Sequence, residues 1–177
     1  MKSLKQFFLK SYIKYPLPLF LQGRVSLAVY DKWLNERANT LHIRDLQKKR
    51  PYAVTATKGV YKEKIHAAVN AAGEFDPYTG DPLQWELIGT WDAKKAKERH
   101  DDYKSEFALM PTIDHIDPDF LEFEICSWLI NDSKCGMNPK QFLELCQRII
   151  AFRSERKKTG KSPFTGKTDI PEGVQHE

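Results

Sequence analysis

The residues of this chain that are best suited to chemistry lie between positions 111 and 134. Asp114 and His115 are adjacent, Asn131 follows 16 residues after His115, and Lys134 comes three residues later. A histidine titrates near neutral pH and can take a proton from water. Aspartate and asparagine offer the hard oxygen ligands that Mg²⁺ and Mn²⁺ prefer. Together these residue types predict base catalysis beside a divalent metal.

Two strands and a short helix must position these side chains. Residues 108–116 are expected to form a strand that leads into a turn. Apolar and acidic residues alternate over 122–128, which predicts a second, half-buried strand, and a short helix follows over 129–135. This order places Asp114 and Asn131 near one point, with the histidine across from it.

The rest of the chain is mainly helical by the same patterns. Pro139 at a first helical position, after Asn138 as N-cap, begins a helix over 139–152. Apolar residues spaced by three and four, together with helix-prone composition, predict further helices. These expected helices cover residues 4–14, 25–49, 59–72 and 92–107. A short apolar stretch at 84–88 favours another strand.

The central pattern resembles the HNH, or His-Me finger, nuclease family. Members show Asp-His-Ile at the end of a first strand, then a second strand, then a helix opening with Asn-x-x-Lys. This chain has Asp114-His115-Ile116 and Asn131-Asp132-Ser133-Lys134, and the likeness covers about 75–150. It implies a ββα-metal finger in which His115, Asp114 and Asn131 are catalytic. It also implies one Mg²⁺ or Mn²⁺ on Asp114 and Asn131, and hydrolysis of DNA that leaves a 5′-phosphate.

The chain departs from the family pattern at its cysteines. Many members carry Cys-x-x-Cys-Gly where this chain has Tyr78-Thr79-Gly80, and a second pair where it has Cys126 alone. A tetrahedral thiolate site therefore cannot form, and we expect no structural zinc. Apolar packing would hold the finger instead. The candidate core residues are Trp85, Phe123, Ile125, Trp128 and Phe142.

A second departure concerns the group that orients the histidine. Members often carry another asparagine between the two strands, and the matching Phe120-Leu121-Glu122 has none. Asp119, Glu122 or a backbone carbonyl could take that role, or the histidine is less well oriented. The sequence leaves these alternatives open.

Charge is distributed unevenly along the chain. The 177 residues carry a net charge of +4, made of +9 over 1–74 and −5 over 75–177. Basic residues that could follow a phosphate backbone, with salt-dependent affinity, are Lys48, Lys49, Arg50, Lys134, Arg153, Arg156, Lys157 and Lys158. The competing interpretation is that these charges form solvated faces. DNA is the partner we expect, and the oligomeric state stays open.

Length and composition predict an α+β chain with a core of its own. We expect a helical basic region over 1–74, an HNH-like core over 75–153 and a basic, flexible tail over 154–177. No apolar run approaches the length of a membrane span, so we expect no membrane contact. Three cysteines without a Cys-x-x-Cys pair favour a reducing compartment, and hence the cytoplasm.

Two other functions compete with the nuclease. A non-catalytic nucleic-acid-binding module could retain the finger only as a scaffold, and the missing middle asparagine favours it. The second is a helical adaptor that binds other proteins, in which the Asp114-His115 pair has no functional role. Metal-dependent cleavage of DNA separates the nuclease from both.

Overall fold

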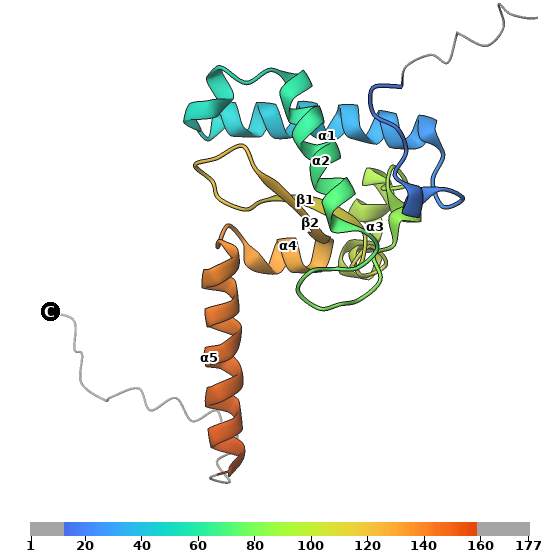
Figure 1. The fold of residues 1–177 in the computed structure, drawn as a ribbon. Helices are drawn as coiled ribbons and strands as arrows, with labels where there is room; N and C mark the ends of the chain where they lie inside the picture. The colour runs from blue at the N-terminus through green and yellow to red at the C-terminus, as the bar shows by residue number, and fades with distance from the viewer. Residues whose placement is uncertain (1–12, 159–177) are drawn as a thin grey trace, which may run out of the picture. The chain divides into compact units, whose positions relative to one another are not determined.

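A computed structural model describes residues 13–158. The chain divides into two compact units, Met1–Asn138 and Pro139–Glu177. The longer helices and the strands are α1 (Leu27–Gln47), α2 (Lys58–Ala72), α3 (Ala93–Ser105), β1 (Pro111–His115), β2 (Phe123–Ser127), α4 (Trp128–Lys134) and α5 (Pro139–Lys158) (Figure 1). Three short 3₁₀ helices are η1 (Leu19–Leu21), η2 (Pro51–Val54) and η3 (Trp85–Leu87). The chain is therefore α+β, as its sequence predicts, and α5 is the described part of the second unit.

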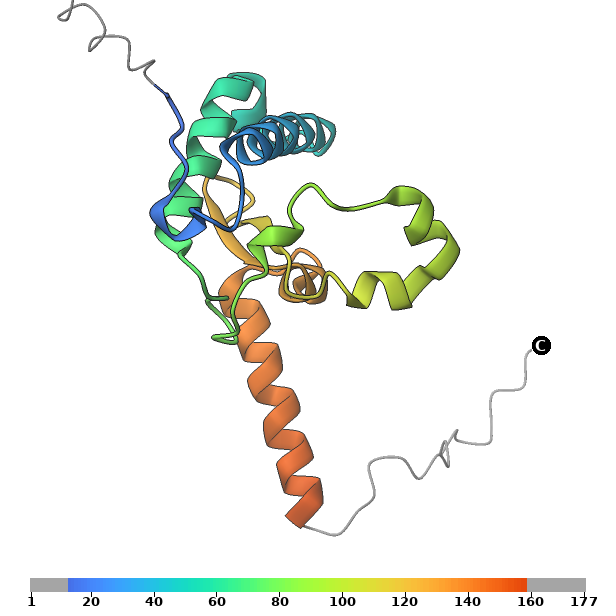
Figure 2. The same cartoon turned by 90° about the vertical axis from the view of Figure 1, so that its right-hand side faces the viewer.

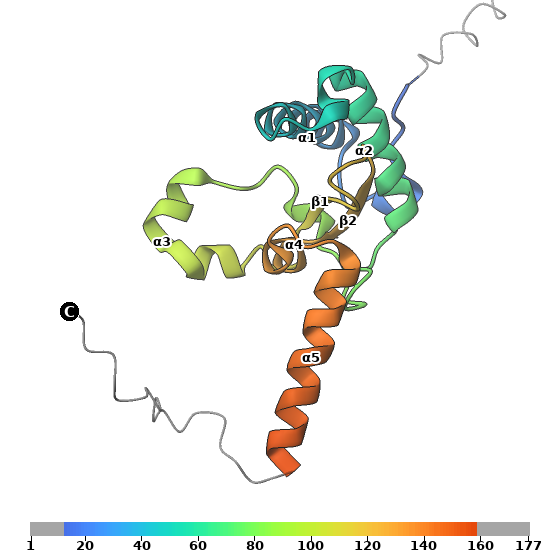
Figure 3. The ribbon, with the colours of Figure 1, turned by 90° about the vertical axis from the view of Figure 1, so that its left-hand side faces the viewer.

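The two strands form an antiparallel hairpin that separates two faces. Thr112 pairs with Cys126 and Asp114 with Glu124 on one face, while Ile113 pairs with Ile125 on the other. Side chains alternate across a strand, so His115 shares the face of Ile113. Helices α1 and α2 cover the face of His115, and α4 covers the face of Asp114 (Figures 2 and 3).

One hydrophobic core joins the helical N-terminal part to the strands. Tyr30 and Leu34 of α1, Tyr61 of α2, and Phe123 and Ile125 of β2 belong to the same buried cluster. Helices α1 and α2 bury their apolar faces against the hairpin, so this core extends across the predicted domain boundary between 74 and 75. The chain divides between Asn138 and Pro139.

Several expected elements are present and some differ. Helices α1 and α2 match the predicted 25–49 and 59–72, and each begins at a capping hydroxyl, of Ser26 and Thr57. The predicted strand at 84–88 is wrong. Trp85 and Ile88, three residues apart, are both buried, which suits the single 3₁₀ turn found there. Helix α3 is interrupted at His100, whose φ is 48°.

The ends of the chain depart further from the prediction. Of the predicted helix over 4–14, residues 1–12 lie outside the described part, and residues 13 and 14 are not helical. Helix α5 extends past 152 to Lys158. The first five residues of the predicted tail over 154–177 are therefore helical, and its remainder, 159–177, lies outside the described residues.

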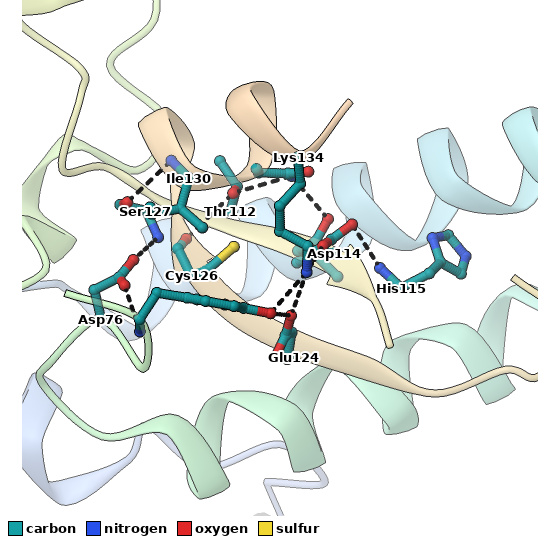
Figure 4. Close-up of polar contacts among 12 residues, drawn as sticks. Asp76, Thr112, Asp114, His115, Glu124, Cys126, Ser127, Ile130 and Lys134 are labelled. Carbon is teal, nitrogen blue, oxygen red and sulfur yellow. Dashed lines mark hydrogen bonds and ion pairs between the residues drawn. The ribbon is translucent and has the colours of Figure 1, made fainter. Parts of the chain in front are cut away.

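A buried aspartate joins the turn after α2 to the start of α4. One Asp76 oxygen accepts from the backbone N–H of Tyr78 (2.8 Å) and of Thr79 (3.0 Å), and the other accepts from that of Ser127 (2.6 Å). Ser127 in turn caps α4 through the N–H of Ile130 (Figure 4). Burial alone would raise the pKa of Asp76, but these N–H donors lower it below its usual value.

Replacing Asp76 with alanine is expected to lower the free energy of unfolding by at least about 2 kcal/mol, because buried N–H donors lose their acceptor. Urea denaturation measures this loss, with exposed Asp81→Ala in the same turn as control. Since folding lowers the pKa of Asp76, its contribution is present above about pH 4 and disappears as the pH falls further. Equal midpoints for the two variants would contradict this role.

Candidate functional site

A pocket of about 340 Å³ opens beside the end of β1, within the first unit. The three predicted catalytic residues, Asp114, His115 and Asn131, all line it. The wall also includes three cations from the end of α1 and the turn after it; they are Arg44, Lys48 and Arg50. The structure thus brings together residues that are up to 87 positions apart in the chain, from Arg44 to Asn131.

His115 holds both ring nitrogens in defined contacts. Its side chain is only 5% exposed. Nε2 lies 2.9 Å from Asp45 Oδ2, and Nδ1 lies 3.2 Å from Arg44 Nη2. A carboxylate accepts hydrogen bonds and a guanidinium donates them. The imidazole therefore carries its hydrogen on Nε2 and its lone pair on Nδ1.

This environment keeps the imidazole neutral. Burial lowers the pKa of His115 to about 4, and the charges of Arg50 and Arg44 act in the same direction, against the opposing effect of Asp45. At neutral pH the ring is therefore unprotonated at Nδ1, which is the state that a general base requires.

Asp45 is the centre of this arrangement. Its side chain is fully buried, and it accepts hydrogen bonds from the Tyr61 hydroxyl (3.0 Å) and the Tyr52 hydroxyl (3.2 Å). Arg50 forms an ion pair with it at 3.1 Å. The group that orients His115 is therefore Asp45, and not Asp119, Glu122 or a backbone carbonyl.

Sequence reasoning missed Asp45, although a signal was present. Leu34, Ala38 and Leu41 follow one face of α1, and Asp45 continues that spacing four residues later. A carboxylate at the next position of an apolar stripe must find partners inside the protein. Arg44, which the sequence analysis also missed, has a buried Nε atom without a hydrogen-bond partner within the described residues.

Lys134 is buried on the opposite face of the hairpin, which Figure 4 shows. Its side chain is 1% exposed, and Nζ lies 2.7 Å from Asp114 Oδ2, 2.8 Å from Glu124 Oε1 and 2.7 Å from the Tyr78 hydroxyl. Tyr78 also donates to Glu124. The predicted contact of Lys134 with a phosphate is therefore wrong. Lys134 and Ile130, four residues apart, share the inner face of α4.

The charge of Lys134 is maintained by these partners. Burial by itself would lower the pKa of Lys134, but hydrogen bonds to Asp114, Glu124 and Tyr78 raise it above its ordinary value. An ammonium held between two carboxylates keeps Asp114 in a fixed position at the edge of the pocket.

Asp114 and Asn131 could hold a metal ion. The Asn131 amide nitrogen donates to Thr112 Oγ1 (3.1 Å) and to the Ile113 carbonyl (3.5 Å), so its oxygen is the atom left for a ligand. Asp114 Oδ1 accepts the N–H of His115 (2.9 Å) and has a further lone pair. One carboxylate and one amide oxygen suit Mg²⁺, which usually keeps several waters. Over residues 13–158 no group of three or more His, Cys, Asp or Glu is placed to hold a metal.

The remaining basic residues are not among those that line this pocket. Lys49 has a positive φ of 55° just after α1 and does not line the pocket. Arg153 and Arg156 belong to α5 in the second unit, and Lys157 and Lys158 end that helix. A contact of these residues with DNA stays a prediction.

Comparisons with models of known protein families, with curated proteins and with solved structures found no match. Among residues 13–158 there is no helix with the length and apolar character needed to cross a membrane.

Proposed function

We propose that this chain is a metal-dependent endonuclease that hydrolyses phosphodiester bonds of DNA, with His115 as general base. The observation that carries the proposal is the composition of one pocket. It holds a neutral imidazole, a carboxylate and an amide, and its wall carries Arg44, Lys48 and Arg50. Cations of this kind attract a phosphate, and arginine binds it through paired hydrogen bonds.

The residues divide the work of hydrolysis between them. The Nδ1 lone pair of His115 would take the proton of the attacking water. Asp45 accepts the N–H at Nε2, so it fixes the ring and would stabilise the imidazolium as it forms. Asp114 and Asn131 would hold Mg²⁺ or Mn²⁺, which, when bound, supplies positive charge for the non-bridging and departing oxygens.

Arg44 links substrate binding to the base. In the described structure its guanidinium donates to Nδ1 of His115. A phosphate in the pocket offers Arg44 a charged acceptor, which makes a stronger hydrogen bond than a neutral ring nitrogen. Binding of the substrate would therefore draw Arg44 away and leave Nδ1 to the water.

A second candidate is a non-catalytic nucleic-acid-binding module. The observations that favour it are that Arg44 covers Nδ1 of His115 and that Lys134 pairs with Asp114. In such a module both contacts would persist when nucleic acid binds.

Incubation of the purified chain with supercoiled plasmid tests the proposal. Nicked or linear product is expected with Mg²⁺ or Mn²⁺, and none is expected with EDTA. The family resemblance implies products with a 5′-phosphate. We therefore expect that the product ends can be ligated directly. Salt-dependent binding without cleavage at any divalent metal would instead select the binding module.

The two metal ligands give a separate prediction. Replacing Asp114 with asparagine, or Asn131 with alanine, should raise the Mn²⁺ concentration for half-maximal cleavage by about tenfold or more. Losing only a residue that hydrogen-bonds to a metal ligand already lowers metal affinity by about tenfold or more. Titration of Mn²⁺ against the cleavage rate measures the effect. Asp119→Asn, at an exposed position of the hairpin turn, is the control. An unchanged midpoint in both ligand variants would reject this pair.

A further inference from the structure

A second pocket, of about 300 Å³, lies next to the candidate active site in the first unit. We name it the stacking pocket, and it shares three of its lining residues, Arg44, Trp128 and Asn131, with the catalytic pocket. Its other walls include Arg37 of α1 and Trp91 before α3. A chain molecule bound across the catalytic pocket could therefore continue into it.

The stacking pocket contains a large aromatic ring that is held in place. Trp91 is 38% exposed. Three rings support it at centroid distances of 5.0 Å (Phe107), 5.2 Å (Tyr103) and 5.6 Å (Trp128), with interplanar angles of 73°, 48° and 66°. These tilted and edge contacts fix the indole while part of it stays open to solvent. A fixed, partly open indole is suited to stack on a flat ligand.

Two arginines give this pocket positive charge. Arg37 and Arg44 are seven residues apart, so they lie on one face of α1 two turns apart. Arg37 is half-buried, and across residues 13–158 it forms no hydrogen bond or ion pair. Arg44 contributes the buried Nε atom that has no partner in the same part of the chain. The Arg37 guanidinium is thus available to an anionic group along the pocket, and that of Arg44 becomes available when it leaves Nδ1 of His115.

We propose that the stacking pocket binds the base of an unpaired nucleotide that neighbours the scissile phosphate. This inference rests on the proposed function. The base would stack against Trp91, while Arg37 and Arg44 contact the flanking phosphates. Inside a duplex both faces of a base are covered by its neighbours, so the nucleotide must be single-stranded or turned out of the helix. The preferred substrate is therefore DNA that is unpaired beside the cleavage site.

Binding of two probes to the intact chain tests this inference without cleavage. One probe is a single-stranded oligothymidine. The other is an oligomer of the same length with deoxyribose and phosphate but no bases. Fluorescence anisotropy in EDTA, at one salt concentration, gives the affinity of the chain for each probe. A variant that has lost stacking should show a lower affinity only for the probe that has bases.

Trp91→Ala should weaken binding of oligothymidine by about 5- to 150-fold, the range for loss of one stacked base, and leave binding of the abasic probe unchanged. Trp91→Phe keeps a ring and should retain most of the affinity, which separates stacking from misfolding. Phe75→Ala removes an exposed aromatic residue that lines neither pocket and should change neither affinity.

The charged residues behave differently under the same proposal. Arg37→Gln should weaken both probes alike, because phosphate contacts do not depend on the base. Lys32→Gln, at an exposed position on the same helix, is the charge-matched control and should leave both affinities near wild type.

Three other results of these binding measurements would each support or overturn the stacking pocket. Equal weakening of both probes by Trp91→Ala, or no weakening, overturns the stacking pocket. If the wild-type chain binds neither probe, the stacking pocket is wrong, and plasmid cleavage decides the nuclease separately. Base-dependent binding through Trp91 without plasmid cleavage supports the pocket and rejects only the nuclease.

Discussion

Replacing His115 with alanine is expected to lower the rate of metal-dependent plasmid cleavage by about 10²- to 10⁴-fold, the usual contribution of a general base. The neutral ring presents its lone pair at Nδ1, and among residues 13–158 no other histidine lines the pocket. DNA affinity should stay near that of the wild type, because the cations Arg44, Lys48 and Arg50 remain. Initial cleavage rates at saturating Mg²⁺, with anisotropy for binding, measure both quantities.

His100→Asn is the control for this experiment. His100 is exposed and has a positive φ, which asparagine tolerates better than most residues. The control should cleave like the wild type. A His115→Ala variant that keeps its rate to within about threefold, well short of the loss of a base, would remove His115 from catalysis.

Replacing Asp45 with alanine should lower the free energy of unfolding by about 3–5 kcal/mol, as expected when one member of a buried ion pair is removed. The substitution leaves Arg50, Tyr52, Tyr61 and His115 without their shared acceptor. Urea denaturation followed by circular dichroism gives the change. Asp31, which lies on the same helix α1 and pairs with Lys62 of α2, supplies the control, because its side chain is 51% exposed. Asp31→Ala should cost about 1 kcal/mol or less.

Asp45→Asn separates the stability of the fold from catalysis. The amide oxygen can still accept the N–H of His115, but it carries no charge to stabilise the imidazolium that forms during proton transfer. We expect a folded variant whose cleavage rate falls while its affinity for DNA is kept. If Asp45→Ala is no less stable than Asp31→Ala, the buried cluster does not hold the fold together in the way described here.

Helix α1 contributes directly to the candidate site. Helix α1 supplies the carboxylate that orients His115 and the arginine that covers its Nδ1. It also supplies three further lining residues of the stacking pocket, Arg37, Thr40 and Leu41. Helix α1 is therefore an integral part of the candidate site. The hairpin and α4 alone would lack the partner of the proposed base.

The sequence by itself determined the local structure around the site. Alternation along 122–128 predicted β2, apolar spacing predicted α1 and α2, and the order of Asp114, His115 and Asn131 predicted that they meet in space. These features follow from residue periods of about two and 3.6, which a strand and a helix impose on neighbouring residues. The stretch 84–88 has too few residues for its apolar pattern to distinguish a strand from a helical turn. The structure has a 3₁₀ turn there and not the expected strand.

The tertiary structure alone decided which charged groups pair. His115 and Asp45 are 70 residues apart, and Lys134 turns inward to Asp114 instead of outward to a phosphate. Local periodicity places a side chain on a face, but its partner depends on which element packs there. Burial then forces every charged group to find an opposite charge or a hydrogen bond. Because α1 packs on one face of the hairpin, His115 pairs with Asp45. Because α4 packs on the other face, Asp114 pairs with Lys134.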